Sequence, residues 1–309
     1  MRSDESPQAA QSAEKLWFFT LVGSPEDVPH ARLLIESIRT FGGSYSGCPI
    51  LVLMSSPDTP TREIERINGV QCRMLTSRSE IPRYWFAQKV AACDQAEGIA
   101  TEEKIRSLVW LSTRCLVVNQ PDLFDLYSSF DAACRPVHIR NVGLPVDEPL
   151  DEFWSPIFKS IGLDDTERWV ESFTDRQKLR PYFNTHLFVV NPLKSVFRSW
   201  RESFMAMVTD HEFQIGPCRD SDHKIFLHQA ILSALVLKLL DWDRIRVLPP
   251  EYSYPLHLHQ DTPPEHRWET INTLVCPVYE EMFRYPDSLN GIGIHDPLRS
   301  WLMARSPGR

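Results

Sequence analysis

The chain has 309 residues, of which 42% are hydrophobic and 11% aromatic, so most of its length is expected to fold around a sizeable core. The net charge of −8 argues against nucleic-acid binding over the whole surface. Glycine is scarce, with 12 residues, and neither the G-x-G-x-x-G nor the G-x-x-x-x-G-K-[ST] phosphate-binding motif occurs.

Cysteine usage and the chain ends bear on the compartment. The seven cysteines are odd in number and form no C-x-x-C pair, which predicts buried free thiols and a cytoplasmic location. No stretch approaches the ~20 apolar residues of a membrane span, so none is expected. Residues 1–14 are polar, without the apolar run of a signal peptide, and are predicted to be a disordered lead. Residues 305–309 are predicted to be a frayed tail.

Apolar runs alternate with amphipathic segments through the first half of the chain. The expected strands are 16–22, 49–54, 70–75 and 107–111. The expected helices are 31–41, 60–68 and 84–97. Strand and helix in alternation are typical of a parallel α/β sheet.

The second half is more mixed. Its expected strands are 115–118, 131–137, 185–191 and 245–249. Its expected helices are 151–161, 165–173, 194–208 and a long apolar one at 222–240, with Asp222 as N-cap. With no visible linker, we predict an α/β fold with a mostly parallel central sheet flanked by helices. It would form one domain, 15–304, with halves 15–130 and 131–304.

Short polar segments interrupt the apolar strands at two places. Ser112, Thr113 and Arg114 separate two apolar runs, so they would lie at a strand end facing a cleft, or form a tight connection without a ligand. Asn184 begins another buried strand, where its amide would bond a hydroxyl-rich ligand or simply cap the strand.

Several further polar residues have both a functional and a structural interpretation. His228 and Gln229 enter an apolar helix, and a satisfied buried histidine is the alternative to a site. His257 and His259 would project to one side of an extended segment, but a convincing third zinc ligand is absent from the sequence. Asp220 is either a general base or a solvated loop carboxylate.

Four segments occur in an order that resembles GT-A fold glycosyltransferases. They are Phe183-Asn184-Thr185, Asn191-Pro192, Gln229-Ala230-Ile231-Leu232 and Leu248-Pro249-Pro250-Glu251-Tyr252-Ser253-Tyr254-Pro255. The chain is similar in particular to the glycogenin and lipopolysaccharide galactosyltransferase group, often called family 8, over residues 16–258 at low identity. The resemblance implies a GT-A-like nucleotide-diphospho-sugar transferase fold, with a nucleotide-binding first half and an acceptor-side second half.

The resemblance also implies an activity and a set of site residues. The activity is transfer of a sugar from a nucleotide-diphosphate donor, preferably a UDP-sugar, to an unknown acceptor. Gln229 would lie near the reacting carbon, and Asn184 would touch a sugar. Thr20 and Val22 would flank the base and ribose. Donor contacts with the diphosphate are implied for Lys89, Ser112, Thr113, Arg114 and His257.

The chain departs from the family at its metal-binding D-x-D motif, whose two aspartates fall on Ser112 and Arg114. Mg²⁺ and Mn²⁺ need hard anionic oxygen ligands, so we expect no metal and no other cofactor. Arg114 would bind the diphosphate directly and assist catalysis, or else pair with Asp122 or Asp125. His228 stands where the family has Asp, which leaves the stereochemical outcome open.

Two alternatives remain at this point. Loss of both aspartates also fits a catalytically inactive GT-A-like protein that binds a nucleotide or a partner. A nucleotidyltransferase is less favoured, because its class usually has a basic Gly-rich loop after the first strand, whereas residues 23–27 are acidic.

Overall fold

The computed structural model describes residues 15–76, 81–280 and 291–305. The expected lead at 1–14 and the tail beyond Arg305 lie outside these residues. Arg305 itself is anchored, because its guanidinium pairs with Glu36 at 2.7 Å. Among the helices within the described ranges, none has the length and apolarity that crossing a bilayer requires.

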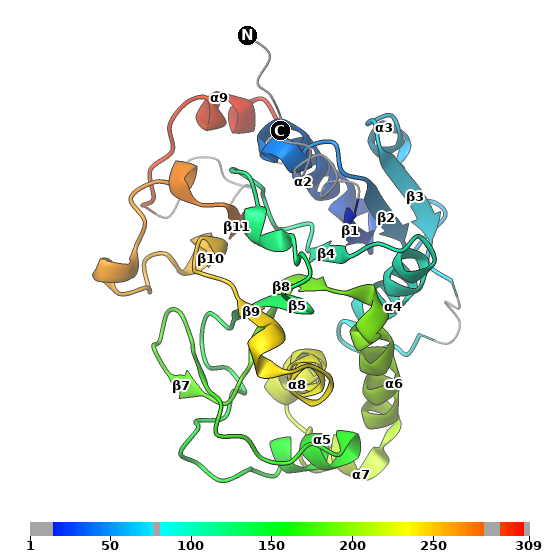
Figure 1. The fold of residues 1–309 in the computed structure, drawn as a ribbon, viewed down its shortest axis with the longest axis vertical. Coiled ribbons are helices and arrows are strands. Elements are labelled where there is room, and N and C mark those ends of the chain that lie inside the picture. The colour runs from blue at the N-terminus through cyan, green and yellow to red at the C-terminus, as the bar shows by residue number, and fades with distance from the viewer. Residues whose placement is uncertain (1–14, 77–80, 281–290, 306–309) are drawn as a thin grey trace.

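A seven-stranded sheet with the order β3-β2-β1-β4-β8-β5-β9 forms the centre of the molecule (Figure 1). Neighbouring strands are parallel except where β8 runs antiparallel to β4 and β5. The strands are β1 (Leu16–Val22), β2 (Ile50–Met54), β3 (Val70–Met74), β4 (Ser107–Leu111), β5 (Ala132–Pro136), β8 (Phe183–Val190) and β9 (Ile245–Val247). The α/β prediction with a mostly parallel central sheet is confirmed.

Successive side chains of each strand point to opposite faces of the sheet. Helices cover both of these faces. Phe18 of β1 faces α2 (Val28–Phe41) and joins its Leu34 and Ile35 in one apolar cluster. Phe19 faces the other side of the sheet, towards five further helices. These are α4 (Ala87–Glu102), α5 (Trp154–Ile161), α6 (Val196–Thr209), α7 (His211–Ile215) and α8 (Ser221–Leu239).

Smaller elements complete the fold. They are α3 (Arg62–Glu65), β6 (Val170–Glu171), β7 (Lys178–Leu179), β10 (Tyr252–Pro255), β11 (Cys276–Val278) and α9 (Leu298–Met303). β10, β11 and α9 lie together on the side of the molecule away from α5 and α8 (Figure 1). All seven cysteines are free, and all but the half-buried Cys72 are buried, as predicted.

The expected strand at 115–118 does not belong to the central sheet. After Ser112 the chain leaves the sheet and pairs with the segment around β11, since Leu116 N donates to Pro277 O (3.0 Å) and Val118 N to Val275 O (2.9 Å). The apolar run that suggested a strand is explained by burial, because alternate side chains of this segment enter two different apolar clusters.

Two other predictions are wrong for local reasons. The expected helix at 165–173 is absent, because Asp165 accepts from Thr166 N (2.8 Å) and pairs with Arg180, which favours a turn over helical hydrogen bonds. Asp220, rather than Asp222, is the N-cap of α8, and its carboxylate accepts from His223 N at 2.9 Å.

Candidate functional site

The strand order reverses at β1, which has β2 on one side and β4 on the other. In open α/β sheets, ligands bind beyond the carboxyl ends of the strands at such a reversal. Here this edge carries the loops that follow Val22 and Leu111. Because Leu111 pairs with Leu187 of the antiparallel β8, residues 183–186 extend past the end of β4 at the same edge.

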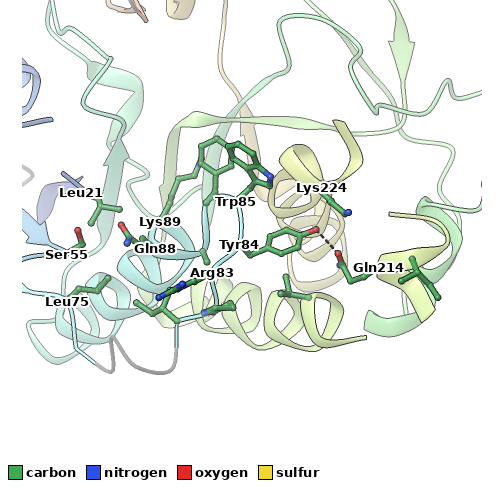
Figure 2. A pocket seen from close by; sticks show the side chains of 16 residues that line it. Leu21, Ser55, Leu75, Arg83, Tyr84, Trp85, Gln88, Lys89, Gln214 and Lys224 are labelled. Atoms are coloured by element: carbon green, nitrogen blue, oxygen red, sulfur yellow. Dashed lines mark hydrogen bonds between the residues drawn. The ribbon is translucent and has the colours of Figure 1, made fainter. Parts of the chain in front are cut away.

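A cavity of about 1140 Å³ opens at this edge, on the sheet face that carries α4. Figure 2 shows its wall, which runs from the ends of β1 and β2 to the start of α8. Its described lining contains three basic side chains, Arg83, Lys89 and Lys224, and no acidic one. In a chain with a net charge of −8, this is a site suited to an anion.

Two aromatic side chains form an exposed part of the cavity wall. Trp85 is 56% exposed and Phe86 is 43% exposed. Phe86 has a positive φ of 58°, which places its ring 4.2 Å from Lys89 Nζ and 4.3 Å from the His228 ring centroid. Exposed flat rings beside cations are suited to a ligand that is both planar and charged.

A polar cluster behind the cavity joins α4, β8 and α8. The Thr185 hydroxyl accepts from Lys89 Nζ at 3.0 Å and lies 3.0 Å from His228 Nε2 and 3.3 Å from Gln229 Oε1. His228 Nδ1 donates to Ile225 O (2.9 Å), so Nε2 can only accept, and the single Thr185 proton is shared between this nitrogen and Gln229 Oε1. The sequence-predicted residues Lys89 and Gln229 therefore share one partner, Thr185.

Burial sets the charge states in this cluster. It lowers the pKa of Lys89 to about 8, although the nearby Glu280 acts in the opposite direction. It lowers the pKa of His228 well below its usual value, and the charge of Lys89 adds to this effect. At neutral pH the ammonium of Lys89 is thus the charged group, next to a neutral imidazole.

A second group of polar side chains surrounds Asn184. Its Oδ1 accepts from both the backbone N–H (2.7 Å) and the Nδ1 (2.8 Å) of His186. The other ring nitrogen of His186, Nε2, lies 2.5 Å from Glu280 Oε1. Burial would raise the pKa of Glu280, but the hydrogen bond from His186 and the charge of Arg114 lower it to about 2. Glu280 is therefore an ionised carboxylate that interacts electrostatically with Lys89 and Arg114.

Arg114 lies at the same edge, but its protein partner is neither Asp122 nor Asp125, so that expectation is wrong. Its Nη2 is 3.6 Å from Asp27 Oδ1, whereas Asp27 Oδ2 accepts from the backbone N–H groups of the loop after β1. Arg114 Nη1 is buried and has no hydrogen-bond partner among the described residues. One arm of the guanidinium fork is therefore buried without an acceptor among the described residues, and Arg114 does not line the cavity.

This arrangement does not suit a divalent cation. Ser112 offers a hydroxyl that already accepts from Arg114 N at 3.3 Å, and Arg114 contributes a positive charge. Of the two carboxylates near this point, Asp27 lies 3.6 Å from Arg114 Nη2 and Glu280 is held by His186. Mg²⁺ and Mn²⁺ prefer several hard oxygen ligands in an open arrangement, which this set of side chains does not provide.

The remaining predicted donor contacts lie farther from the cavity wall. Thr20 and Val22 are buried on the face of β1 that packs against α2, and the neighbouring Leu21 lines the cavity instead. Thr113 is 7% exposed, and its carbonyl oxygen accepts from Tyr279 Oη (3.0 Å).

The late histidines do not project together. His257 belongs to a 3₁₀ turn over Leu256–Leu258 and lies near His138, with ring centroids 6.2 Å apart. His259 Nδ1 instead bonds the Tyr254 hydroxyl at 2.7 Å.

Sequence reasoning missed Thr185, His186, Glu280 and Trp85 as parts of this edge. Thr185 and His186 follow Asn184 directly, so the polar run at the start of a buried strand was a usable signal. Glu280 and Trp85 belong to no motif and reach the site only through tertiary contacts.

No protein-family model matches the chain, and no curated protein matches its sequence. Solved structures do match, among them the apo form of mouse xyloside xylosyltransferase 1. The two structures align with a TM-score of 0.48 at 8% identity, covering 86% of this chain and 98% of that chain. At this identity no residue role is transferred from one chain to the other.

Proposed function

We propose that the carboxyl edge of the sheet binds a nucleoside-diphosphate sugar and that the protein transfers this sugar to an acceptor hydroxyl. The observation that carries the proposal is the composition of the cavity wall, where three basic side chains and two exposed aromatic rings occur with no described acidic residue. A nucleotide sugar combines a planar base with a diphosphate, the two chemistries that such a wall accommodates.

We propose one orientation of the donor at this edge. The base and ribose would lie at the ends of β1 and β2, near Leu21 and Ser55, with Trp85 as the stacking surface. The diphosphate would then lie between Lys89 and Arg114, where the free Nη1 of Arg114 provides one arm of a charge-assisted fork. We take UDP as the preferred donor nucleotide, as the motif resemblance implies.

The protein's own cations would assist departure of the diphosphate. When the bond between the sugar and the diphosphate breaks, negative charge grows on the leaving phosphate oxygens. Lys89 and Arg114 are held in place before reaction by Thr185 and Asp27, so little reorganisation is needed. Transfer is proposed to proceed without a divalent metal.

Gln229 and Asn184 are proposed to orient the reacting sugars. Both side chains are almost fully buried, at 6% and 5% exposed, and each is fixed from the protein side. Gln229 contacts Thr185 behind Lys89, and Asn184 is held by His186. Gln229 lies behind Lys89, which lines the cavity, and Asn184 precedes Thr185 in the same strand, an arrangement that supports the motif-based assignment.

A second candidate function is nucleotide binding without transfer. The observation that favours it is the replacement of the acidic pair by Ser112 and Arg114. Glu280 is already held by His186, which leaves no obvious carboxylate for catalysis among the described residues of this edge. Both candidates predict donor binding, and they differ only in turnover.

Thermal unfolding with UDP and with UDP-sugars, in the presence of EDTA, tests donor binding. A ligand at one hundred times its Kd adds about 2.7 kcal/mol to stability. If no nucleoside diphosphate or nucleotide sugar at millimolar concentration shifts the melting temperature, the donor site is wrong.

Release of UDP from the bound donor tests transfer. Asn184→Ala and Gln229→Ala should lower turnover strongly and leave the fold intact. The exposed control Gln71→Ala should not change turnover. Donor binding without any UDP release by the parent protein would favour the second candidate.

A further inference from the structure

The cavity is larger than one small-molecule site requires. Its volume of about 1140 Å³ exceeds the roughly 300–1,000 Å³ typical of ligand pockets. In Figure 2 its lining residues fall into two groups, with Leu21, Ser55 and Leu75 at one end and Gln214 and Lys224 at the other. Lys89 and Trp85 lie between the two ends.

The end formed by the helices has a fixed polar floor. The Tyr84 hydroxyl donates to Gln214 Oε1 at 3.0 Å, and Gln214 Nε2 donates to Met207 O at 3.0 Å. The Tyr84 ring packs edge-on against Phe204, with centroids 5.7 Å apart. Because these side chains hold one another, the surface is formed before a ligand arrives.

Apolar side chains remain exposed around this floor. Ile215 is 62% exposed and Trp85 is 56% exposed, although both line the cavity, and Val208 completes the wall. Large apolar side chains gathered at the mouth of a cavity mark a surface that a ligand covers.

Lys224 adds a positive charge to this apolar wall. The carboxylate one helical turn earlier, Asp220, is already engaged, because it caps α8 and lies 2.5 Å from His223 Nδ1. No acidic side chain in the described part of the chain lies within ion-pair distance of Lys224. The half-buried ammonium lines the cavity and, among the described residues, has no counter-ion.

We propose that the helix end of the cavity is the acceptor site and that it selects an acceptor carrying both a flat apolar group and an anionic group. The apolar group would cover Ile215 and Val208, and the carboxylate or phosphate would pair with Lys224. This inference rests on the proposed function, since it places the acceptor opposite the donor with Lys89, Thr185 and Gln229 between them.

The proposed arrangement accounts for the atoms of transfer. The acceptor oxygen forms a bond to the anomeric carbon, and the bond from that carbon to the diphosphate oxygen breaks with its electron pair. The hydroxyl proton of the acceptor passes to the departing diphosphate. No oxidant, reductant or further reactant is needed.

Calorimetric binding of two glucosides that differ in one charge tests the proposal. The probes are 4-carboxyphenyl β-D-glucoside and the neutral 4-(hydroxymethyl)phenyl β-D-glucoside, titrated with UDP at saturation. The anionic probe should bind about tenfold more tightly, as expected for one charge-assisted contact. Lys224→Met should remove this preference, and Lys159→Met, on the exposed surface of α5, should keep it.

Three results would overturn the acceptor site: failure of both glucosides to bind, equal affinity of the parent protein for the two, or an unchanged preference in Lys224→Met. Displacement of the anionic probe by UDP would also contradict it, since the cavity would then hold one ligand only. If UDP itself does not bind, the donor proposal fails. A Lys224-dependent preference measured without UDP would show that the second site survives that failure.

Discussion

The two edges of the central sheet each hold a carboxylate near cations, and they differ in what those cations have left to bind. At the amino edge of the parallel strands, Asp131 precedes β5 and is 2% exposed at its side chain. At the carboxyl edge, Glu280 is 33% exposed, lies against His186 and interacts electrostatically with Lys89 and Arg114.

The amino-edge cluster is complete. Asp131 accepts from Arg244 Nε (2.5 Å) and Asn191 Nδ2 (2.9 Å), and it pairs with Lys194 Nζ at 3.2 Å. Burial alone would raise the pKa of Asp131, but these partners lower it well below its usual range. Here Asp131 is the shared partner of these groups, and it does not line the cavity described above.

At the carboxyl edge, two cations are less completely bonded. Arg114 Nη1 has no hydrogen-bond partner among the described residues, and Lys89 donates only to the neutral Thr185 hydroxyl and faces the Phe86 ring. A closed ion cluster stabilises the fold, whereas a cation that lines a cavity, as Lys89 does, can bind an anion from solution. The comparison thus separates a structural edge from the edge at which we propose that the donor binds.

The largest expected effect on folding is at the amino edge. Asp131→Ala should lower the free energy of unfolding by about 3 kcal/mol, because it leaves several cations without their shared carboxylate. UDP affinity should not change. Urea unfolding monitored by circular dichroism measures the first effect, and calorimetry measures the second. Loss of UDP binding in a folded Asp131→Ala protein would break the distinction between the edges.

The same carboxylate predicts an acid dependence of stability. Because the folded-state pKa of Asp131 lies below its unfolded value, its contribution is fully present above the unfolded pKa of about 4. That contribution is lost progressively as the pH falls through the lower folded-state pKa. The stability difference between parent and Asp131→Ala should therefore shrink as the pH is lowered below about 4.

Glu280→Gln should strengthen UDP binding, by about tenfold, or about 1.4 kcal/mol. The carboxylate shares the cations that the diphosphate needs, and removing its charge leaves them to the ligand. Glu202→Gln, on the exposed face of α6, serves as the matched control. Weaker UDP binding by Glu280→Gln would instead assign Glu280 to the donor contacts.

The pH dependence of UDP binding should report Lys89. Its lowered pKa of about 8 means that the free protein loses this charge as the pH rises through 8, so affinity should fall above that pH. Lys89→Met should bind UDP more weakly at pH 7 and show no such fall. A parent protein whose affinity is flat from pH 7 to 9.5 would place Lys89 outside the diphosphate site.

The smallest effect is expected for Thr20→Val. The Thr20 hydroxyl is buried on the α2 face and has no hydrogen-bond partner among the described residues, so an isosteric methyl should raise stability by up to about 1 kcal/mol. UDP affinity should stay within twofold. A larger loss of affinity would restore Thr20 to the donor contacts that the motif resemblance implied.

Much of the sheet could be predicted because its strands are short apolar runs bounded by polar turns. β1 and β4 have the expected bounds, and β2 and β3 differ by one residue. The antiparallel direction of β8 could not be read from Phe183–Val190, since a strand buried on both faces has the same pattern in either direction.

The site was predictable only in part. Lys89, Asn184 and Arg114 each stand near the start or end of an apolar element, a position visible in the sequence, whereas Gln229 lies in the middle of α8 and reaches Lys89 through Thr185. Asp27 and Glu280 lie 87 and 166 positions from Arg114 in the chain. No local sequence pattern links residues that are so far apart. Thr20 was expected in the site, but the alternation of side chains along β1 places it on the α2 face, while Leu21 faces the cavity.

Calorimetric titration of UDP into the parent protein and Arg114→Ala, both in EDTA, tests most directly whether fixed cations at the carboxyl edge bind the diphosphate. The parent should bind without metal, and Arg114→Ala should bind ten- to hundredfold more weakly, a loss of about 1.5–3 kcal/mol, while Arg198→Ala on the surface of α6 binds like the parent. Arg114→Lys should recover only part of the loss, because an ammonium does not reproduce the guanidinium fork. Binding that requires Mn²⁺, or equal UDP affinity of Arg114→Ala and the parent, would contradict the proposal.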